Sequence, residues 1–314
     1  MLLPKMPEFS APLYDLLSRA YRLLFKMKYP LQQNVSDYQP FFIIGSGRCG
    51  STLLRRMLDA HPGVHIPPET YVLGEVIRLY MRNRQMDWKY IVNTVYAVFE
   101  FSPEFDKFEM HMAPLVHRMW HAPEAERSLA YLLDAFYRYH GEVHNIDVQL
   151  WGDKTPQNTF DLDVISKTFP KAKYLHLLRD GVDVAASFVE RGLQPDLLVA
   201  ARHWQRTVNM SQSFMEANPD ACIEVRYEDL VRDPQSQMQS ICHFLNIHFD
   251  EKMIRSLEHT QGMGDLHAYE HYKKVLGPVS DKNIGLGRRN LSSDDLEVIV
   301  KVIGPSLKKF GYLD

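Results

Sequence analysis

Short apolar runs alternate with stretches of helical spacing along most of the chain. Four of these runs, at 41–45, 148–153, 173–180 and 221–229, are each followed by turn residues and then by a helical pattern. A repeated order of strand, loop and helix is typical of a parallel sheet with helices on both faces. We therefore predict an α/β fold of three layers, in which a central, mostly parallel sheet is flanked by helices.

Two other stretches are helical by their spacing. Residues 10–28 place leucines on one stripe beside basic residues, which predicts an amphipathic helical segment within residues 1–40. This helix either packs on the main domain or lies at a membrane interface. Residues 41–314 are predicted to form a single domain, with a helical insertion at about 71–147 that is rich in aromatic side chains. Most of these aromatics should belong to the core, and some should wall a ligand pocket.

Composition narrows the function classes. The 314 residues carry 36 Lys and Arg against 39 Asp and Glu, a formal charge of −3, which argues against a nucleic-acid binder. Cys49, Cys222 and Cys242 are too few for a disulfide framework and have no metal-ligand spacing, so we expect no metal. Charges and prolines interrupt the first forty residues, which predicts no membrane span. The predicted location is cytoplasmic, with peripheral membrane contact through the N-terminal helix as the alternative, and the oligomeric state stays open.

A glycine-rich loop follows the first predicted strand and precedes a helix. Glycines let backbone N–H groups converge on an anion, and the helix N-terminus adds partial positive charge. Gly45 and Gly50 have the spacing of a nucleotide triphosphatase loop, but Ser51 stands where its lysine would be. Together with Arg48, this predicts a P-loop-like fold that binds a terminal phosphoryl-type group. The loop residues expected to contact it are Ser46, Gly47, Arg48, Cys49, Gly50, Ser51 and Thr52.

Basic residues also mark the ends of the next two strands. Lys154 follows the second strand, and it is either a functional cation or a solvated surface lysine. Arg179 ends the third strand, and Ser187 and Arg191 lie four residues apart on one face of the following helix. Two arginines and a hydroxyl that converge in this way can hold a second phosphate. The alternative is that Arg179 and Asp180 form a helix cap with a salt bridge.

These motifs carry a family resemblance. The segments GSGRCGSTLL, WGDKTPQN, YLHLLRDGVDVAASF and VRYEDLVRDP resemble, in this order, the motifs of sulfotransferases that use 3′-phosphoadenosine 5′-phosphosulfate. The resemblance runs from about residue 41 to residue 234, and LLRRMLDAHPGVHIPPET is most similar to the tyrosylprotein and bacterial branch. It implies an O-sulfotransferase that moves the sulfuryl group to an acceptor hydroxyl and releases adenosine 3′,5′-bisphosphate.

The resemblance also implies roles for single residues. Arg48 and Lys154 are expected to stabilise the transferring group and the leaving phosphate, and Glu69 is expected to be the general base. His61 and His65 are alternative bases. The expected donor contacts are Arg48, Gly50, Ser51 and Thr52 at the 5′ end, Arg179, Ser187 and Arg191 at the 3′-phosphate, Tyr227 near the nucleotide, and Gly287 and Arg288 in a closing C-terminal loop. Cations and backbone N–H groups replace a divalent metal in this scheme.

The sequence indicates the acceptor substrate less clearly than the donor. In the tyrosylprotein branch, arginines just after the base grip acidic peptides, whereas this chain has Tyr71 and Glu75 there. We therefore expect a partly apolar or aromatic alcohol, a phenol, a lipid or a glycan. Ser280 stays open as the serine that assists the lysine in that branch.

Two other functions compete with this interpretation. One is a P-loop kinase or nucleotide hydrolase, against which Ser51 argues. The other is an inactive nucleotide-binding module, against which the joint presence of Arg48, Lys154 and Glu69 argues.

Overall fold

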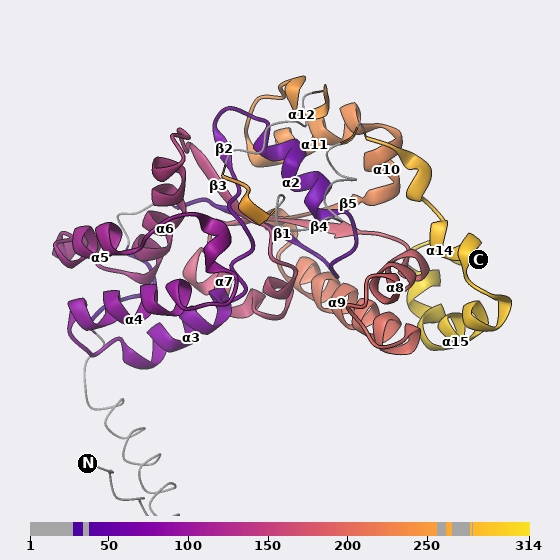
Figure 1. Ribbon diagram of the computed structural model, residues 1–314, viewed down its shortest axis with the longest axis horizontal. Helices are drawn as coiled ribbons and strands as arrows, with labels where there is room; N and C mark the ends of the chain where they lie inside the picture. The colour runs from indigo at the N-terminus through magenta and orange to yellow at the C-terminus, as the bar shows by residue number, and fades with distance from the viewer. Residues whose placement is uncertain (1–27, 34–37, 256–261, 266–276, 278) are drawn as a thin grey trace, which may run out of the picture.

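A computed structural model of the chain describes residues 28–33, 38–255, 262–265, 277 and 279–314 (Figure 1). Five strands form one sheet in the order β2-β3-β1-β4-β5, and each neighbouring pair is parallel. The predicted α/β fold with a central sheet is confirmed. The strands are β1 (Phe41–Ile44), β2 (Val64–His65), β3 (Leu150–Asp153), β4 (Lys173–Leu178) and β5 (Cys222–Arg226).

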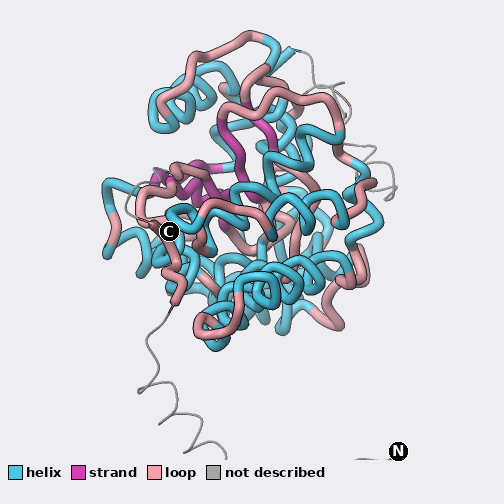
Figure 2. Tube along the Cα trace, turned by 90° about the vertical axis from the view of Figure 1, so that its left-hand side faces the viewer, coloured by secondary structure: helices cyan, strands magenta, loops and turns pink. Residues whose placement is uncertain are grey.

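The central strand β1 is buried on both faces, which explains its continuous apolar sequence. Phe41 and Ile43 pack into one core, and Phe42 and Ile44 pack into another, because successive side chains of a strand point to opposite faces. Figure 2 shows the strands inside a shell of helices.

Helices from distant parts of the sequence cover the two faces (Figure 1). The core that contains Phe41 and Ile43 includes residues from α2 and from the helices that follow β5. The helices of this layer are α2 (Ser51–Asp59), α10 (Tyr227–Arg232), α11 (Pro234–Leu245) and α12 (Lys252–Arg255).

The opposite core, around Phe42 and Ile44, is built mainly by the segment predicted as a helical insertion. Aromatic rings fill it, with Phe99 and Phe136 stacked at 4.2 Å and Tyr137 and Trp151 stacked at 3.9 Å between ring centroids. This layer contains α3 (Leu73–Asn83), α4 (Trp88–Glu100), α5 (Ala113–Trp120), α6 (Leu129–Val143) and α7 (Leu162–Thr168), with the short helices η2 (Phe105–Phe108), η3 (Glu124–Glu126) and η4 (Pro156–Phe160).

A third core lies beyond the carboxyl end of β4, where Leu178 and Trp204 pack among three helices. The helices that build this core are α8 (Gly181–Glu190), α9 (Leu197–Ala217) and α15 (Ser293–Lys309). The remaining short helices are η5 (Pro219–Ala221), η7 (Asp281–Asn283) and α14 (Leu286–Asn290).

The predicted N-terminal helix, residues 10–28, lies outside the described residues except for its last position. The segment that follows packs on the insertion, because the ring of Tyr29 lies 5.1 Å from that of Trp88 and Tyr80 donates to the Pro30 carbonyl at 3.0 Å. In the part of the chain that the structure describes, no helix has both the length and the apolar character needed to cross a membrane.

Candidate active site

The loop between β1 and α2 adopts left-handed backbone conformations that favour glycine. Gly47 and Gly50 have φ angles of 70° and 98°, and Arg48 also lies in the left-handed region, at 54°. A Cβ atom on Gly50 would lie 2.4 Å from the ring of Tyr227. The loop therefore brings its backbone directly against the residue that follows β5.

The loop leaves the N-terminus of α2 open to an anion. Among the described residues, no side chain caps this end, and the first turn holds no acidic residue. The Gly50 carbonyl accepts from the amides of Leu53 and Leu54 at 2.9 and 3.2 Å. The preceding amides, those of Ser51 and Thr52, thus belong to the first turn, whose N–H groups have no carbonyl partner within the helix.

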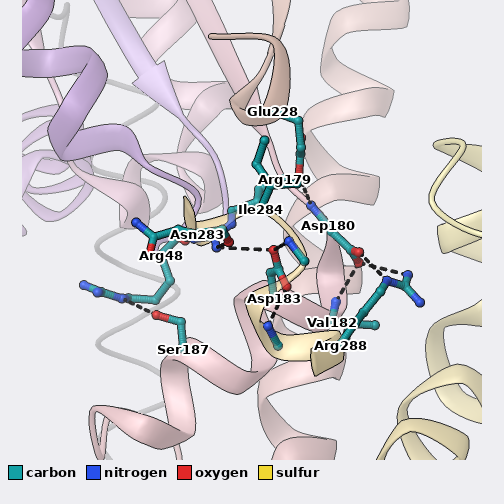
Figure 3. Close-up of polar contacts among 12 residues, drawn as sticks. Arg48, Arg179, Asp180, Val182, Asp183, Ser187, Glu228, Asn283, Ile284 and Arg288 are labelled. Carbon is teal, nitrogen blue, oxygen red and sulfur yellow. Dashed lines mark hydrogen bonds and ion pairs between the residues drawn. The ribbon is translucent and has the colours of Figure 1, made fainter. Parts of the chain in front are cut away.

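Arg179, at the carboxyl end of β4, joins this loop to the C-terminal part of the chain (Figure 3). Its guanidinium donates to the Arg48 carbonyl at 3.1 Å and to the Asn283 carbonyl at 2.8 Å. It also lies 4.5 Å from the centre of the Tyr227 ring. The Nε atom of Arg179 is buried and has no hydrogen-bond partner among the described residues. One donor of the arginine is therefore available to a ligand.

Asp183 on α8 is central to this network, although sequence reasoning did not select it. Its buried carboxylate accepts from the amides of Gly285 and Gly287, each at 2.7 Å, and from Arg179 at 3.3 Å. These contacts fasten the C-terminal loop to the start of α8 (Figure 3). The sequence did contain a signal for the pair with Arg179, because Asp183 lies four residues after this arginine in RDGVDV.

A cavity of about 550 Å³ lies between these elements. Ser187 lines it and accepts from Nε of Arg48 at 3.3 Å, and Arg191 also lines it, with an Nε that lacks a partner among the described residues. Ser280, left open in the sequence, is a further lining residue. The expected donor contacts that line the cavity are Arg48, Gly50, Ser51, Thr52, Arg179, Ser187, Arg191, Tyr227 and Gly287.

Three predicted loop contacts, Ser46, Gly47 and Cys49, are not among the residues that line the cavity, so their contact with the donor stays a prediction. The hydroxyl of Ser46 donates to the carbonyl of Gly47 at 3.0 Å. A Cβ on Gly47 would lie 3.3 Å from the ring of Phe188. Cys49 is buried, and this burial raises the pKa of its thiol, so it is held as a neutral core residue.

Arg288 also lies outside the cavity lining. Its Nε donates to Asp180 at 2.6 Å, and its NH2 group donates to the Tyr312 carbonyl at 2.8 Å (Figure 3). Asp180 in turn caps α8 by accepting from the Val182 amide at 2.9 Å. Burial raises the pKa of the Asp180 carboxyl, and Arg288 opposes this shift. A direct contact of Arg288 with the donor stays a prediction, since its neighbours here are protein groups.

Glu69 and Lys154 form an ion pair, although they are 85 residues apart in the chain. Both side chains are nearly buried, with exposed fractions of 10% for Glu69 and 1% for Lys154. The adjoining backbone is pinned, because the Thr70 amide donates to the hydroxyl of Thr155 at 3.0 Å. The predicted base and the predicted cation thus lie together at the carboxyl end of β3.

Asp153, the residue before Lys154, fixes this end of β3 from the insertion side. Its buried carboxylate accepts from Tyr137 of α6 at 2.5 Å, from Thr70 at 3.0 Å and from Asn158 at 2.8 Å. Burial raises the pKa of Asp153, and the hydrogen bonds oppose this shift. Helix α6 therefore supports the Glu69–Lys154 pair.

The two alternative bases have other partners. His65 Nε2 lies 2.8 Å from His140 Nδ1, and both rings are fully buried. His65 Nδ1 lies 3.6 Å from the carboxylate of Asp59. The Nδ1 atom of His61 accepts from the Gly63 amide at 3.1 Å. Glu69 is therefore the candidate base that contacts Lys154.

The described residues contain no group of three or more His, Cys, Asp and Glu side chains that could hold a metal ion. Arginine side chains and the open N-terminus of α2 surround the cavity, and the ion pair of Glu69 and Lys154 lies outside the residues that line it. Such an arrangement suits the transfer of an anionic group by electrostatic stabilisation.

The parallel sheet, the glycine-rich loop and the cation-lined cavity define a P-loop-like group-transfer protein. A profile described as the Sulfotransferase family matches residues 40–251. The chain belongs to this family, and its chemistry is sulfuryl transfer.

Curated relatives agree with this assignment. Protein-tyrosine sulfotransferase 1 of Danio rerio is 25% identical over 98% of this chain and 81% of its own length. Protein-tyrosine sulfotransferase A of Caenorhabditis elegans is 25% identical over 87% of this chain and 67% of its own length. The sulfotransferase domain of the Synechococcus PCC 7002 olefin synthase shares the fold, with a TM-score of 0.60 and 23% identity over 86% of this chain and 96% of that domain.

Proposed function

We propose that this protein moves a sulfuryl group from 3′-phosphoadenosine 5′-phosphosulfate to an acceptor hydroxyl, with Glu69 as general base. The observation that supports this most is the contact between Glu69 and Lys154. A proton acceptor and a cation placed side by side can serve one reacting centre, where one takes the hydroxyl proton and the other stabilises developing negative charge.

The residues present fit this donor. The unpartnered Nε atoms of Arg179 and Arg191 and the hydroxyl of Ser187 would hold its 3′-phosphate. The open N-terminus of α2 and the side chain of Arg48 would hold the 5′ end. When bound, the donor supplies an activated sulfuryl group on a phosphate leaving group.

Each proposed catalytic side chain has a separate task. Lys154 and Arg48 offset charge on the leaving phosphate, which lets the reaction proceed without a divalent ion. Glu69 accepts the proton of the acceptor hydroxyl. Thr70, Thr155 and Asp153 hold the backbone on which Glu69 and Lys154 stand, so base and cation keep their relative positions.

The names of the relatives make a tyrosine side chain one acceptor to test, beside alcohols, phenols and glycans. A kinase or nucleotide hydrolase would show Mg²⁺-dependent ATP hydrolysis. An inactive module would bind adenosine 3′,5′-bisphosphate without turnover on any acceptor. The cytoplasmic location expected from the sequence stays a prediction that cell fractionation can test.

The substitution Glu69→Gln tests the proposal. It removes the proton acceptor but keeps the shape of the side chain, so turnover should fall by at least about 100-fold. Binding of adenosine 3′,5′-bisphosphate, measured by calorimetry, should stay at the wild-type level. Glu100→Gln, on the half-buried part of α4, is the matched control. Wild-type turnover in Glu69→Gln would exclude Glu69 as base, and lost bisphosphate binding would mean that its role is structural.

A further inference from the structure

A second hollow lies between α3 and α4, in the layer built by the insertion. It has a volume of about 760 Å³. We call it the α3–α4 groove. Its lining residues are Val72, Glu75 and Leu79 before and on α3, Tyr90, Asn93, Thr94, Ala97 and Val98 on α4, and Phe101, Ser102 and Pro103 after α4.

The spacing of these residues gives the groove a direction. Val72, Glu75 and Leu79 lie on one face of α3, and the α4 positions repeat at intervals of three or four along one face. The eleven-residue step from Tyr90 to Phe101 spans about 16 Å of helix axis. The lining residues therefore run along two neighbouring helices, α3 and α4, which lie side by side in Figure 1.

The walls of the groove are mostly apolar, with Glu75, Asn93, Thr94 and Ser102 as polar residues, and they carry exposed aromatic rings. Phe101 is 84% exposed and Tyr90 is 49% exposed, and Tyr71, next to the groove, is 42% exposed. Large exposed aromatic side chains gathered at one hollow are typical of a binding surface. Among the described lining residues, the one charged side chain is the carboxylate of Glu75. An acidic ligand would be repelled here, and a neutral apolar ligand would be accommodated.

One end of the groove lies beside the proposed catalytic pair. Val72 follows Glu69 by three residues, so their Cα atoms are at most about 11 Å apart. Thr70, between them, is fixed to Asp153 and Thr155, and its carbonyl accepts from the Val72 amide at 2.6 Å. The entrance of the groove is thus held in place relative to Lys154.

We propose that the α3–α4 groove binds the body of the acceptor, and that this acceptor is a neutral alcohol with a long apolar chain. The proposal rests on the proposed function. The chain lies along α3 and α4, and the hydroxyl reaches Glu69 at the Val72 end. A volume of this size matches that of small-molecule sites, which are lined mostly by apolar and aromatic side chains. Glu75 disfavours an acidic tyrosine peptide at the same place.

A series of straight-chain alcohols tests the substrate class. With bisphosphate release as the assay, the KM should fall by up to about fourfold for each added methylene until the groove is filled. An acidic tyrosine-containing peptide should have a lower kcat/KM than 1-decanol. A KM that does not depend on chain length, or a preference for the acidic peptide, overturns the proposal.

Two substitutions place a charge in the groove. Ala97→Glu acts at mid-groove, and Phe101→Asp acts at a position so exposed that folding should be unaffected. In each, the ratio of kcat/KM for 1-decanol over that for 1-butanol should fall at least about tenfold, the loss of two or more buried methylenes. Met86→Glu adds the same charge at an exposed apolar position outside the groove and should keep the wild-type ratio. Equal ratios in all variants overturn the proposal.

Binding without turnover separates this proposal from the proposed function. A long-chain alcohol with a dansyl group at its far end should show a fluorescence change with wild type and Met86→Glu, and a weakened one with Ala97→Glu. This holds even if no acceptor is sulfated, in which case the proposed function fails and the groove assignment stands. Unchanged dansyl-alcohol binding in Ala97→Glu overturns the groove assignment. So does a finding that Ala97→Glu instead changes the oligomeric state or the binding to phosphatidylcholine vesicles.

Discussion

The donor cavity and the α3–α4 groove are built by opposite means. The donor cavity joins the ends of β1, β4 and β5 to the C-terminal loop, and buried charges such as Asp183 and Arg179 hold it together. The groove is formed by two consecutive helices of one insertion and their flanking residues. Its walls are mostly apolar, and Glu75 is the one charged side chain among the described lining residues. The donor cavity depends on a few directional hydrogen bonds and ion pairs, whereas ligand binding in the groove depends on the total apolar area that is buried.

This difference predicts how each site responds to change. A buried hydrogen bond that loses one partner leaves the other unsatisfied, so the loss at the donor cavity is abrupt. Apolar contacts scale with area, so changes in the groove should be graded. Under the proposed roles, residues of the insertion can therefore change without disturbing the donor cavity, provided that Tyr137 still supports Asp153.

The largest effect is expected at Lys154, which lines neither the donor cavity nor the groove and forms an ion pair with Glu69. Lys154→Ala removes the cation that we propose stabilises the leaving group, so kcat should fall by about 100- to 1,000-fold. Because the loss concerns the chemical step, it should be equal for short and long alcohols. Single-turnover kinetics measures it, with the exposed Lys308→Ala as control. A loss confined to one class of acceptor would assign Lys154 to the groove.

A smaller effect is expected at Asp183, which belongs to the donor cavity alone. Asp183→Asn weakens two amide contacts and the pair with Arg179, so the Kd for adenosine 3′,5′-bisphosphate should rise by about 10- to 100-fold. Preference among acceptors should not change. Calorimetry measures the Kd, and Asp229→Asn, on an exposed position of α10, is the control. An unchanged Kd in a folded variant would show that the C-terminal loop does not depend on this carboxylate.

The smallest effect concerns pH and the histidines on the insertion side. Burial, together with the nearby charges of His65, His144 and Arg55, lowers the pKa of His140 well below its ordinary value. The folded protein thus binds fewer protons than the unfolded chain below about pH 6.5. The contribution of neutral His140 to the free energy of unfolding is therefore fully present above that pH, and it declines as the pH falls.

Replacing the titrating group should flatten this decline. A single histidine contributes at most about 1.4 kcal/mol per pH unit to the slope. His140→Gln keeps a polar group beside His65 but cannot titrate, so its Tm should fall less between pH 6.5 and 5 than that of the wild type. Exposed His121→Gln should behave as the wild type does. Parallel Tm curves for His140→Gln and the wild type would assign the acid sensitivity elsewhere.

Features carried by local sequence could be predicted, and features carried by distant contacts could not. The four longer strands were visible as apolar runs, but β2 has two residues, which is too short for any periodic signal. The glycine-rich loop and Arg179 were readable because strand ends of a parallel sheet meet at one edge. The separate roles of Glu69 and Lys154 came from the family resemblance, whereas their contact was not predicted, since no spacing rule spans 85 residues.

The long-range contacts of Asp183 and Arg288 could not be predicted from local sequence patterns. The partners of Asp183 lie 102 and 104 residues further along the chain, so its role depends on a fold that periodicity does not describe. The donor contact of Arg288 comes from the resemblance of its loop and stays a prediction, and its pairing with Asp180 was not predicted from the sequence. The sequence predicted only that some aromatic residues of the insertion wall a ligand pocket. It could not define the groove, because the shared face of α3 and α4 depends on how the two helices pack together.

The contacts of Tyr312 bear on the order in which the two regions are completed during synthesis. Its hydroxyl donates to Glu228 at 2.9 Å, across 84 residues, and Glu228 accepts from the Asp180 amide at 3.0 Å. Arg288 reaches the Tyr312 carbonyl, and Arg226 donates to the carbonyl of Phe310 at 2.6 Å. A ribosome that has already made the groove residues must still produce these later segments before the donor cavity has all of its supporting contacts. During synthesis the α3–α4 groove should therefore form first, and the donor cavity should reach its full binding affinity only after Tyr312 has emerged from the ribosome.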